Sequence, residues 1–223
     1  MTGATQTRKK SPMPADASSC PSDPNAHAGD DVPQLYALSL CNPDGPGGPY
    51  VADVDVSVED DRWTEALPDL AGILERACRG ALDGGHAGDL GSTLEFSVVL
   101  TDDEAVRALN RDYRGRDCPT NVLSFASLDD TGSAPLPEGM PLHLGDIVVA
   151  FDTTLAEAQE RPVPLADHLF HLAVHGILHL LGFDHEDDDE ATEMEALEAD
   201  ILVSSGLSNP YHTAGEIPEE DAK

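Results

Sequence analysis

The sequence HLAVHGILHLLGFDH occupies residues 171–185 and sets four histidines among long apolar side chains. His175 and His179 are four residues apart, so on a helix both imidazoles project from one face and can bind one metal ion. Gly182 follows three residues later, where a glycine can end the helix and turn the chain back. That turn can bring His185 to the same ion. Three imidazoles leave a fourth position on Zn²⁺ open, which is typical of a catalytic site.

Further polar side chains flank this trio. His171 and His168 precede His175 by four and seven residues and so lie on nearly the same side of the helix. Each is a candidate to support the site or to contact substrate, with packing or solvent contact as the alternative. Asp184 can accept the free N–H of a ligand imidazole, or it can cap a helix or remain solvated. We therefore treat His171 and Asp184 as candidates for support of the metal or for substrate contact.

The residue after the first proposed ligand argues against one kind of enzyme. Zinc peptidases with the H-E-x-x-H motif use the glutamate as the general base for the attacking water. Here that position is Gly176. Because general-base help is typically worth about 10²- to 10⁴-fold in rate, peptide hydrolysis by this route is disfavoured.

Arginines gather in one short segment of this acidic chain. Residues 107–116 hold four arginines and one aspartate, a local net charge of +3. Arg107 and Arg111 are expected to form salt bridges on an exposed helix face. Arg114 lies in the turn after that helix and is the candidate to bind a phosphate and to stabilise charge that develops during its cleavage.

Periodicity outlines a mixed fold. Alternation predicts a strand at 51–58, and further strands are expected at 94–100, 122–125 and 146–150. Helical spacing predicts helices at 67–82, 101–112, 152–161, 165–181 and 190–204, the second opened by Thr101 as N-cap. On the last helix, Met194, Leu197, Ile201 and Leu202 predict a packed face, and the glutamates beside them a solvated one. The sequence predicts an α+β fold with a small mixed sheet packed with helices, in which the metal-binding helix is followed by a glycine turn.

Composition sets the domain limits and excludes several functions. Residues 1–50 are rich in Pro and Gly and are expected to be disordered, 51–204 to form the domain, and 205–223 to be an acidic tail. The formal charge of −31 repels nucleic-acid backbones, and 4% aromatic residues disfavour a base-stacking platform, so a polyanionic substrate needs a local feature that overcomes this field. DNA is not an expected partner. No apolar run reaches the ~18 residues of a membrane span, and no signal peptide is recognisable, which favours the cytoplasm.

Three segments together resemble a known family. They are LNRDYRGRDCPTNVLSF at 109–125, LGDI at 144–147, and the histidine segment with its pattern H-G-x-L-H-L-x-G-[FY]-D-H. Over residues 51–204 the chain is similar to bacterial YbeY-type endoribonucleases.

The resemblance implies a zincin-like domain that binds one Zn²⁺ per chain through His175, His179 and His185 and uses Arg114 as its functional arginine. It implies a single-strand-specific endoribonuclease acting in 16S rRNA 3′-end maturation and ribosome quality control in the cytoplasm. Its implied partners are single-stranded RNA and the small ribosomal subunit, with ribosomal proteins or a ribosome-assembly GTPase beside them. The alternatives are a zinc metallopeptidase and a non-catalytic, zinc-containing ribosome-associated module.

Overall fold

The computed structural model describes residues 33–128, 140–185 and 187–211, which form one sheet covered by helices. The strands are β1 (Gln34–Asn42), β2 (Tyr50–Val58), β3 (Thr93–Thr101), β4 (Val122–Ala126) and β5 (Leu142–Ala150), in the order β1-β2-β3-β5-β4. The three central strands are parallel, and the two edge strands run antiparallel to their neighbours. The helices are α1 (Arg62–Ala66), α2 (Leu70–Gly84), α3 (Asp103–Arg114), α4 (Phe151–Glu160), α5 (Leu165–Leu180) and α6 (Asp188–Ser204). The predicted mixed sheet packed with helices is thereby confirmed.

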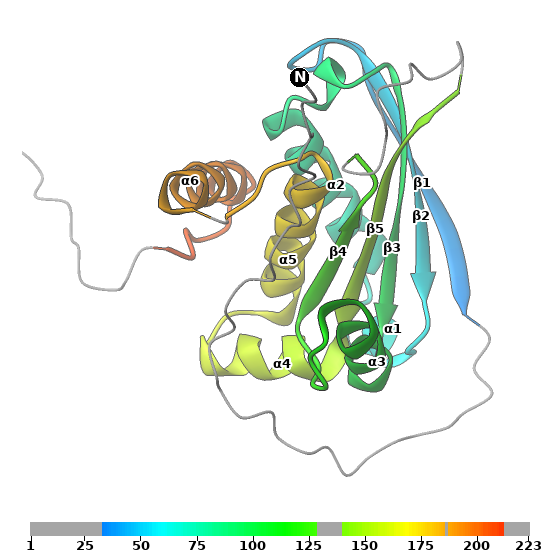
Figure 1. The fold of residues 1–223 in the computed structure, drawn as a ribbon, viewed down its shortest axis with the longest axis vertical. Helices are drawn as coiled ribbons and strands as arrows, with labels where there is room; N and C mark the ends of the chain where they lie inside the picture. Colours follow the sequence, from blue (N-terminus) through cyan, green and yellow to red (C-terminus); the bar gives the residue numbers. More distant parts are fainter. Residues whose placement is uncertain (1–32, 129–139, 186, 212–223) are drawn as a thin grey trace, which may run out of the picture.

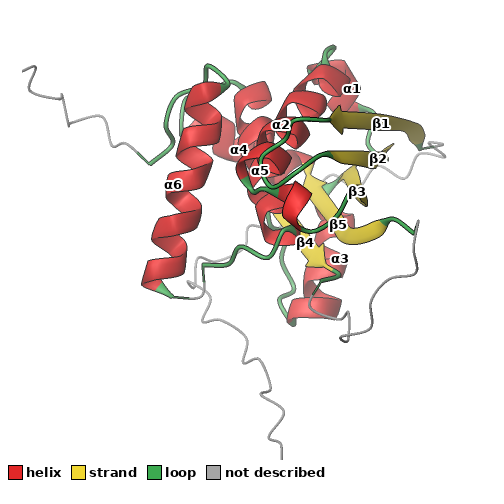
Figure 2. Ribbon diagram, turned by 90° about the horizontal axis from the view of Figure 1, so that it is seen from above, coloured by secondary structure: helices red, strands yellow, loops and turns green. Residues whose placement is uncertain are grey.

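Helices cover the two faces of the sheet unequally. α2 and α5 pack on one face, and α6 lies on the far side of α5, away from the strands (Figures 1 and 2). Alternate residues of β5 separate the two faces: Ile147 and Val149 join the main core, whereas Val148 packs with Val106 of α3. α5 is therefore the central helix. It is apolar on most sides because sheet and helices surround it.

The first strand corrects the predicted domain boundary. Residues 34–42 form β1, which pairs antiparallel with β2 from Gln34 opposite Val58 to Asn42 opposite Tyr50. Leu40 is buried, and Leu38 packs against the same core. The prediction of disorder through residue 50 is therefore wrong for this segment, while residues 1–32 lie outside the described residues.

The opposite end of the domain also extends beyond its predicted limit. Leu207 packs against the core, and Tyr211 hydrogen-bonds to Glu198, so residues 205–211 are not simply a solvated tail. Residues 212–223 of that predicted tail lie outside the described residues.

Two helix starts differ from prediction for local reasons. The helix predicted at 67–82 begins at Leu70, after the short α1, because Leu67 precedes Pro68 and adopts a non-helical backbone. The cap of α3 is Asp102, whose carboxylate accepts the N–H of Ala105 at 2.8 Å, rather than Thr101. No helix within the described ranges combines the length and hydropathy that a bilayer-spanning segment needs.

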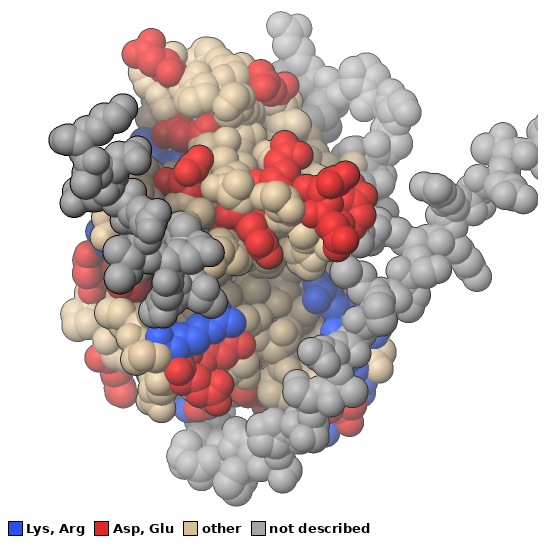
Figure 3. All heavy atoms as spheres, turned by 90° about the vertical axis from the view of Figure 1, so that its left-hand side faces the viewer, with Lys and Arg blue, Asp and Glu red and all other residues tan. Residues whose placement is uncertain are grey.

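Charge is distributed unevenly over the surface. Seen from the side on which α6 lies, acidic side chains are most numerous in the upper half of the molecule, and several basic side chains lie below them beside further acidic ones (Figure 3). The first turn of α6 contributes three exposed carboxylates, Asp188, Asp189 and Glu190. Such a surface repels polyanions at long range, so any phosphate must approach through a local basic region.

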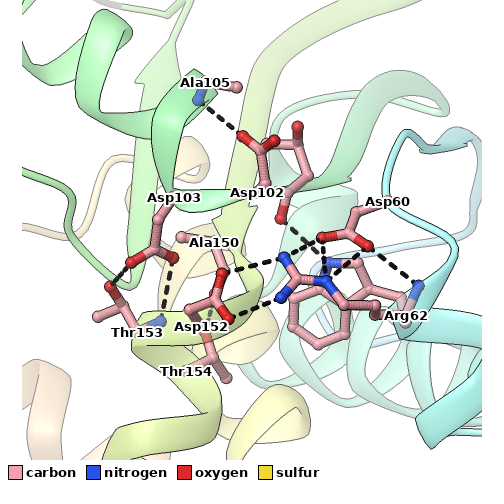
Figure 4. Close-up of polar contacts among 11 residues, drawn as sticks. Asp60, Arg62, Asp102, Asp103, Ala105, Ala150, Asp152, Thr153 and Thr154 are labelled. Atoms are coloured by element: carbon pink, nitrogen blue, oxygen red, sulfur yellow. Dashed lines mark hydrogen bonds and ion pairs between the residues drawn. The ribbon is translucent and has the colours of Figure 1, made fainter. Parts of the chain in front are cut away.

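Polar contacts join three helices, α1, α3 and α4, that follow the C-terminal ends of β2, β3 and β5 (Figure 4). Arg62 of α1 bridges Asp60 and Asp152 and stacks 4.6 Å from the ring centroid of Phe151. Asp103 of α3 accepts hydrogen bonds from the backbone N–H and the hydroxyl of Thr153 in α4. These contacts fix α1, α3 and α4 relative to one another.

Candidate metal centre

The three predicted ligand histidines converge. His175, His179 and His185 each offer one ring nitrogen, and these atoms all lie within 4.8 Å of one another. The first two come from α5, and the third follows its C-terminal turn. The first two rings are partly buried and the third is exposed, so the group opens to solvent on one side.

A glycine turn produces this convergence. Gly182 has a φ of +96°, in the left-handed region that side chains other than glycine rarely adopt. The N–H of Gly182 donates to the carbonyl of His179, and the N–H of Phe183 donates to that of Leu178. These paired bonds form a Schellman motif, which ends α5 and reverses the chain so that His185 returns to the helix.

Hydrogen bonds fix the tautomers of the two helical rings. The Nδ1–H of His179 donates to the carbonyl of Phe183 at 3.0 Å, and that of His175 donates to the carboxylate of Glu198 at 2.7 Å. Because both acceptors lack a proton, each neutral ring carries its hydrogen on Nδ1 and a lone pair on Nε2. The two Nε2 atoms lie 3.1 Å apart.

That spacing fits a cation. Two facing lone pairs repel each other unless a positive charge, either a shared proton or a metal ion, lies between them. Tetrahedral Zn²⁺ with Zn–N bonds of about 2.0–2.1 Å would separate two ligand nitrogens by about 3.3 Å, close to the spacing of these rings. Burial, followed by the charges of His175 and His185, lowers the pKa of His179 to about 4, so this ring is neutral at pH 7, as ligation requires.

A buried carboxylate that the sequence analysis missed adjoins the trio. Glu198 of α6 is 1% exposed, although the glutamates of that helix were predicted to be solvated. Desolvation raises its pKa, but hydrogen bonds from His171, His175 and Tyr211, together with the charge of His175, outweigh that effect and hold the pKa well below its ordinary value. One signal was available, because Glu198 lies four residues after Met194 and three before Ile201, on the apolar face.

The other candidate residues have distinct surroundings. His171 contacts Glu198, with its Nε2 at 2.8 Å from the carboxylate. Asp184 accepts the backbone N–H of His185 at 2.8 Å, and its charge acts on His179. The sequence predicts Asp184 as the acceptor for a ligand ring, whereas the Nδ1 atoms of His175 and His179 contact Glu198 and the Phe183 carbonyl.

His168 belongs to a separate buried cluster. Its Nε2 lies 2.8 Å from the carboxylate of Glu157 in α4, which also accepts from the side-chain amide of Asn121 at 2.9 Å. Burial raises the pKa of Glu157, but these two hydrogen bonds prevail and lower it. The cluster ties α4 and α5 to the loop that precedes β4.

Arg114 ends α3, just before Gly115, whose φ is +70°. Among the described residues, no hydrogen bond or ion pair joins Arg114 to the histidines. Desolvation and the charge of Arg116 lower its pKa, although a guanidinium remains charged near neutral pH. The predicted surface salt bridges form at Arg107 with Asp117 and at Arg111 with Asp112.

The segment that carries Arg114 reaches α5 through β4. The ring of Tyr113 packs edge-on against Phe125 of β4, with centroids 5.1 Å apart. β4 in turn packs against α5, where Gly176 leaves room for Ile147 and Ser124. One strand therefore separates the arginine segment from the helix that carries His175 and His179.

Comparison with known proteins gives one consistent result. The family model described as Endoribonuclease YbeY matches residues 69–206. A protein named Endoribonuclease YbeY from Paramagnetospirillum magneticum is 51% identical over 159 residues, covering 71% of this chain and 95% of its own length. Proteins of that name from Rhodospirillum rubrum and Azorhizobium caulinodans are 50% and 51% identical, covering 68% and 74% of this chain and 78% and 99% of their own lengths. With a family model over most of the folded domain and relatives about half identical to it, the chain belongs to the Endoribonuclease YbeY family.

Proposed function

We propose that this protein is a zinc-dependent endoribonuclease that cleaves single-stranded RNA in the cytoplasm. The observation that carries the proposal is the pair of Nε2 lone pairs 3.1 Å apart, with His185 beside them, in a member of a family named for endoribonuclease activity. The i, i+4 pair on α5 and the turn after it support the zincin-like description of the fold.

The donor set suits one Zn²⁺ per chain, held by His175, His179 and His185. When bound, zinc supplies a Lewis acid that neutralises charge on a phosphoryl oxygen and acidifies a water molecule. The protein's own part is to keep both helical rings neutral and aimed at one point, through Glu198 and the Phe183 carbonyl. Their fixed orientation means that little reorganisation is needed when an anionic substrate arrives.

Arg114 is proposed to bind the scissile phosphate and to stabilise its developing charge. A guanidinium matches phosphate oxygens with two parallel N–H donors. The hydrogen bond from Asn121 to Glu157 anchors the loop between the arginine segment and β4. Either water or the 2′-hydroxyl of the RNA serves as nucleophile, and the terminal groups of the cleaved RNA would distinguish them.

The peptidase alternative lacks support from the geometry at Gly176. A Cβ at this position would lie 3.0 Å from Ile147 Cγ2 and 3.2 Å from Ser124 Oγ, so the side chain would point at the sheet. A glutamate there would meet buried atoms of β4 and β5 before it could act as a base. Chelator-sensitive cleavage of an unstructured polypeptide would nevertheless favour the peptidase.

The deciding experiment pairs metal analysis with an RNase assay. Wild type and His179→Ala are compared on single-stranded and duplex RNA, with His143→Ala as control because His143 lies on the exposed part of β5. We expect about one zinc per chain and cleavage of single strands only, with both properties lost in His179→Ala and retained in the control. Equal cleavage by metal-stripped protein would reject the proposal, and bound zinc without cleavage would favour the non-catalytic module.

We further propose that the substrate is the 3′ end of 16S rRNA and that the enzyme also takes part in ribosome quality control. The expected partners are the small ribosomal subunit, with ribosomal proteins or a ribosome-assembly GTPase. Because the chain carries a formal charge of −31, binding to free RNA should be weak and should strengthen with Mg²⁺ or on the subunit. Cosedimentation with small subunits at several Mg²⁺ concentrations tests this, and accumulation of 3′-extended precursor in cells that lack the protein tests the substrate.

A further inference from the structure

We infer that Glu198 is a positioning residue for the metal centre and that α6, through this carboxylate, completes the site on α5. The inference rests on the proposed metal-dependent function. It concerns a residue outside the three ligands and on another helix. Its basis is a set of contacts that converge on one buried side chain.

Both oxygens of Glu198 are occupied by side chains around the site. Oε1 accepts from Nδ1 of His175 at 2.7 Å. Oε2 accepts from Nε2 of His171 at 2.8 Å and from the hydroxyl of Tyr211. The carboxylate therefore joins a proposed ligand to two residues that are not ligands, one on α5 and one beyond the end of α6.

Packing alone does not explain a carboxylate at this position. Met194, Ile201 and Leu202 on the same face of α6 are buried and join the main core. An apolar residue in place of Glu198 would extend that face without the desolvation that a buried charge suffers. The buried carboxylate instead requires hydrogen-bond donors around it, and one of these donors is Nδ1 of the proposed ligand His175.

The consequence for His175 is a fixed tautomer and a fixed ring direction. With Nδ1–H held by Glu198, the lone pair on Nε2 points toward Nε2 of His179. His171 and Tyr211 hold the other oxygen and so limit rotation of the carboxylate. This also assigns His171 a supporting role, since its Nε2 is already committed to Glu198.

The test measures metal binding by the full-length protein. Zinc affinity is determined by competition with a chromophoric chelator for wild type, Glu198→Gln and Glu195→Gln, after circular dichroism has shown that each metal-free protein is folded. Glu195 is the matched control because it is an exposed glutamate on the same helix. Glutamine keeps the shape of the side chain but offers only one acceptor oxygen to three donors.

We expect Glu198→Gln to bind zinc about 10- to 100-fold more weakly and the control to bind within about twofold of wild type. The absorption bands of bound Co²⁺ should shift in Glu198→Gln alone, since they report the geometry of the ligands. An affinity within about threefold of wild type, with an unchanged Co²⁺ spectrum, would overturn the inference.

A second variant keeps the inference testable if Glu198→Gln does not fold. Tyr211→Phe removes one donor to Glu198 from an exposed residue that lies beyond the end of α6. It should weaken zinc binding measurably, by up to about tenfold, and full affinity in this variant would then count against the inference. Failure of the proposed function is distinguishable, because in that case wild-type protein itself would bind no metal or would cut RNA without it.

Discussion

Replacing Gly176 tests whether the close approach of α5 to the sheet leaves no space for a side chain at this position. A Cβ at Gly176 would lie 3.0 and 3.1 Å from two carbons of Ile147, inside the usual carbon–carbon contact distance of about 3.5–4.0 Å. Overpacking of this kind typically costs about 1–3 kcal/mol, whereas Gly→Ala in a helix gains about 1 kcal/mol. We therefore expect Gly176→Ala to lower the free energy of unfolding by about 1 kcal/mol.

Gly72→Ala is the matched control in α2. The three atoms nearest its added Cβ all belong to the carboxylate of Asp69, an exposed side chain that can turn away. That variant should be neutral or more stable by up to about 1 kcal/mol. Gly176→Glu should be far worse, by at least about 4 kcal/mol, because it adds an unpaired charge next to Ile147 and Ser124.

Urea unfolding of the metal-free proteins, followed by circular dichroism, measures these differences in the free energy of unfolding, provided that the variants have the same m-value. Stabilisation of similar size in Gly176→Ala and Gly72→Ala would refute the reasoning, since it would mean that position 176 has free space. A well-folded Gly176→Glu protein with peptidase activity would refute it more strongly.

Three further predictions follow from particular residues. Arg114→Ala should keep its zinc and lose about 10²- to 10³-fold in RNA cleavage rate. Arg111→Ala is the control and should cleave normally, because the Arg111 guanidinium pairs with a neighbouring carboxylate at the surface. Equal cleavage rates in both variants would remove Arg114 from the site. The folded-state pKa of His179 is lowered to about 4 from 6.5, so the unfolded chain takes up a proton first as pH falls. The free energy of unfolding of the metal-free protein should therefore fall by up to about 3 kcal/mol between about pH 6.5 and pH 4. Denaturant titrations at several pH values in that range should show that this free energy depends less steeply on pH in His179→Ala. Leu40 in β1 is 1% exposed, so Leu40→Ala should destabilise the domain by about 2–5 kcal/mol. Leu35 is 77% exposed, so Leu35→Ala should cost less than about 0.5 kcal/mol. Equal melting temperatures of the two variants would place β1 outside the core.

Local patterns predicted most of the fold. β2 and α5 have a clear period of their own, and their observed bounds differ from the predicted ones by one residue at most. β1 was missed because the Pro- and Gly-rich composition of residues 1–50, taken as a whole, hid the short alternation of Tyr36, Leu38 and Leu40. The stability of β1 comes from pairing with β2 and from burial, which a segment's composition does not reveal.

The site residues likewise fall into those that local sequence patterns predict and those that only tertiary packing brings together. His175, His179 and His185 were predictable because helix period and a glycine turn act within eleven residues of sequence. Glu198 is thirteen residues beyond His185 on another helix, and only the packing of α6 against α5 brings it to His175. Its position on the apolar face of α6 was the only trace of this contact in the sequence.

The three proposed ligands differ in how firmly the fold holds them. His179 is held by a backbone carbonyl inside the turn that ends its own helix, so its orientation needs only α5 and Gly182. His175 depends on a side chain of α6, so its orientation needs a second helix to be docked. His185 is exposed, and within the described residues its ring makes no side-chain hydrogen bond. Two of the three proposed ligand rings are therefore oriented once α6 packs against α5, and the exposed third ring is the least constrained of the three.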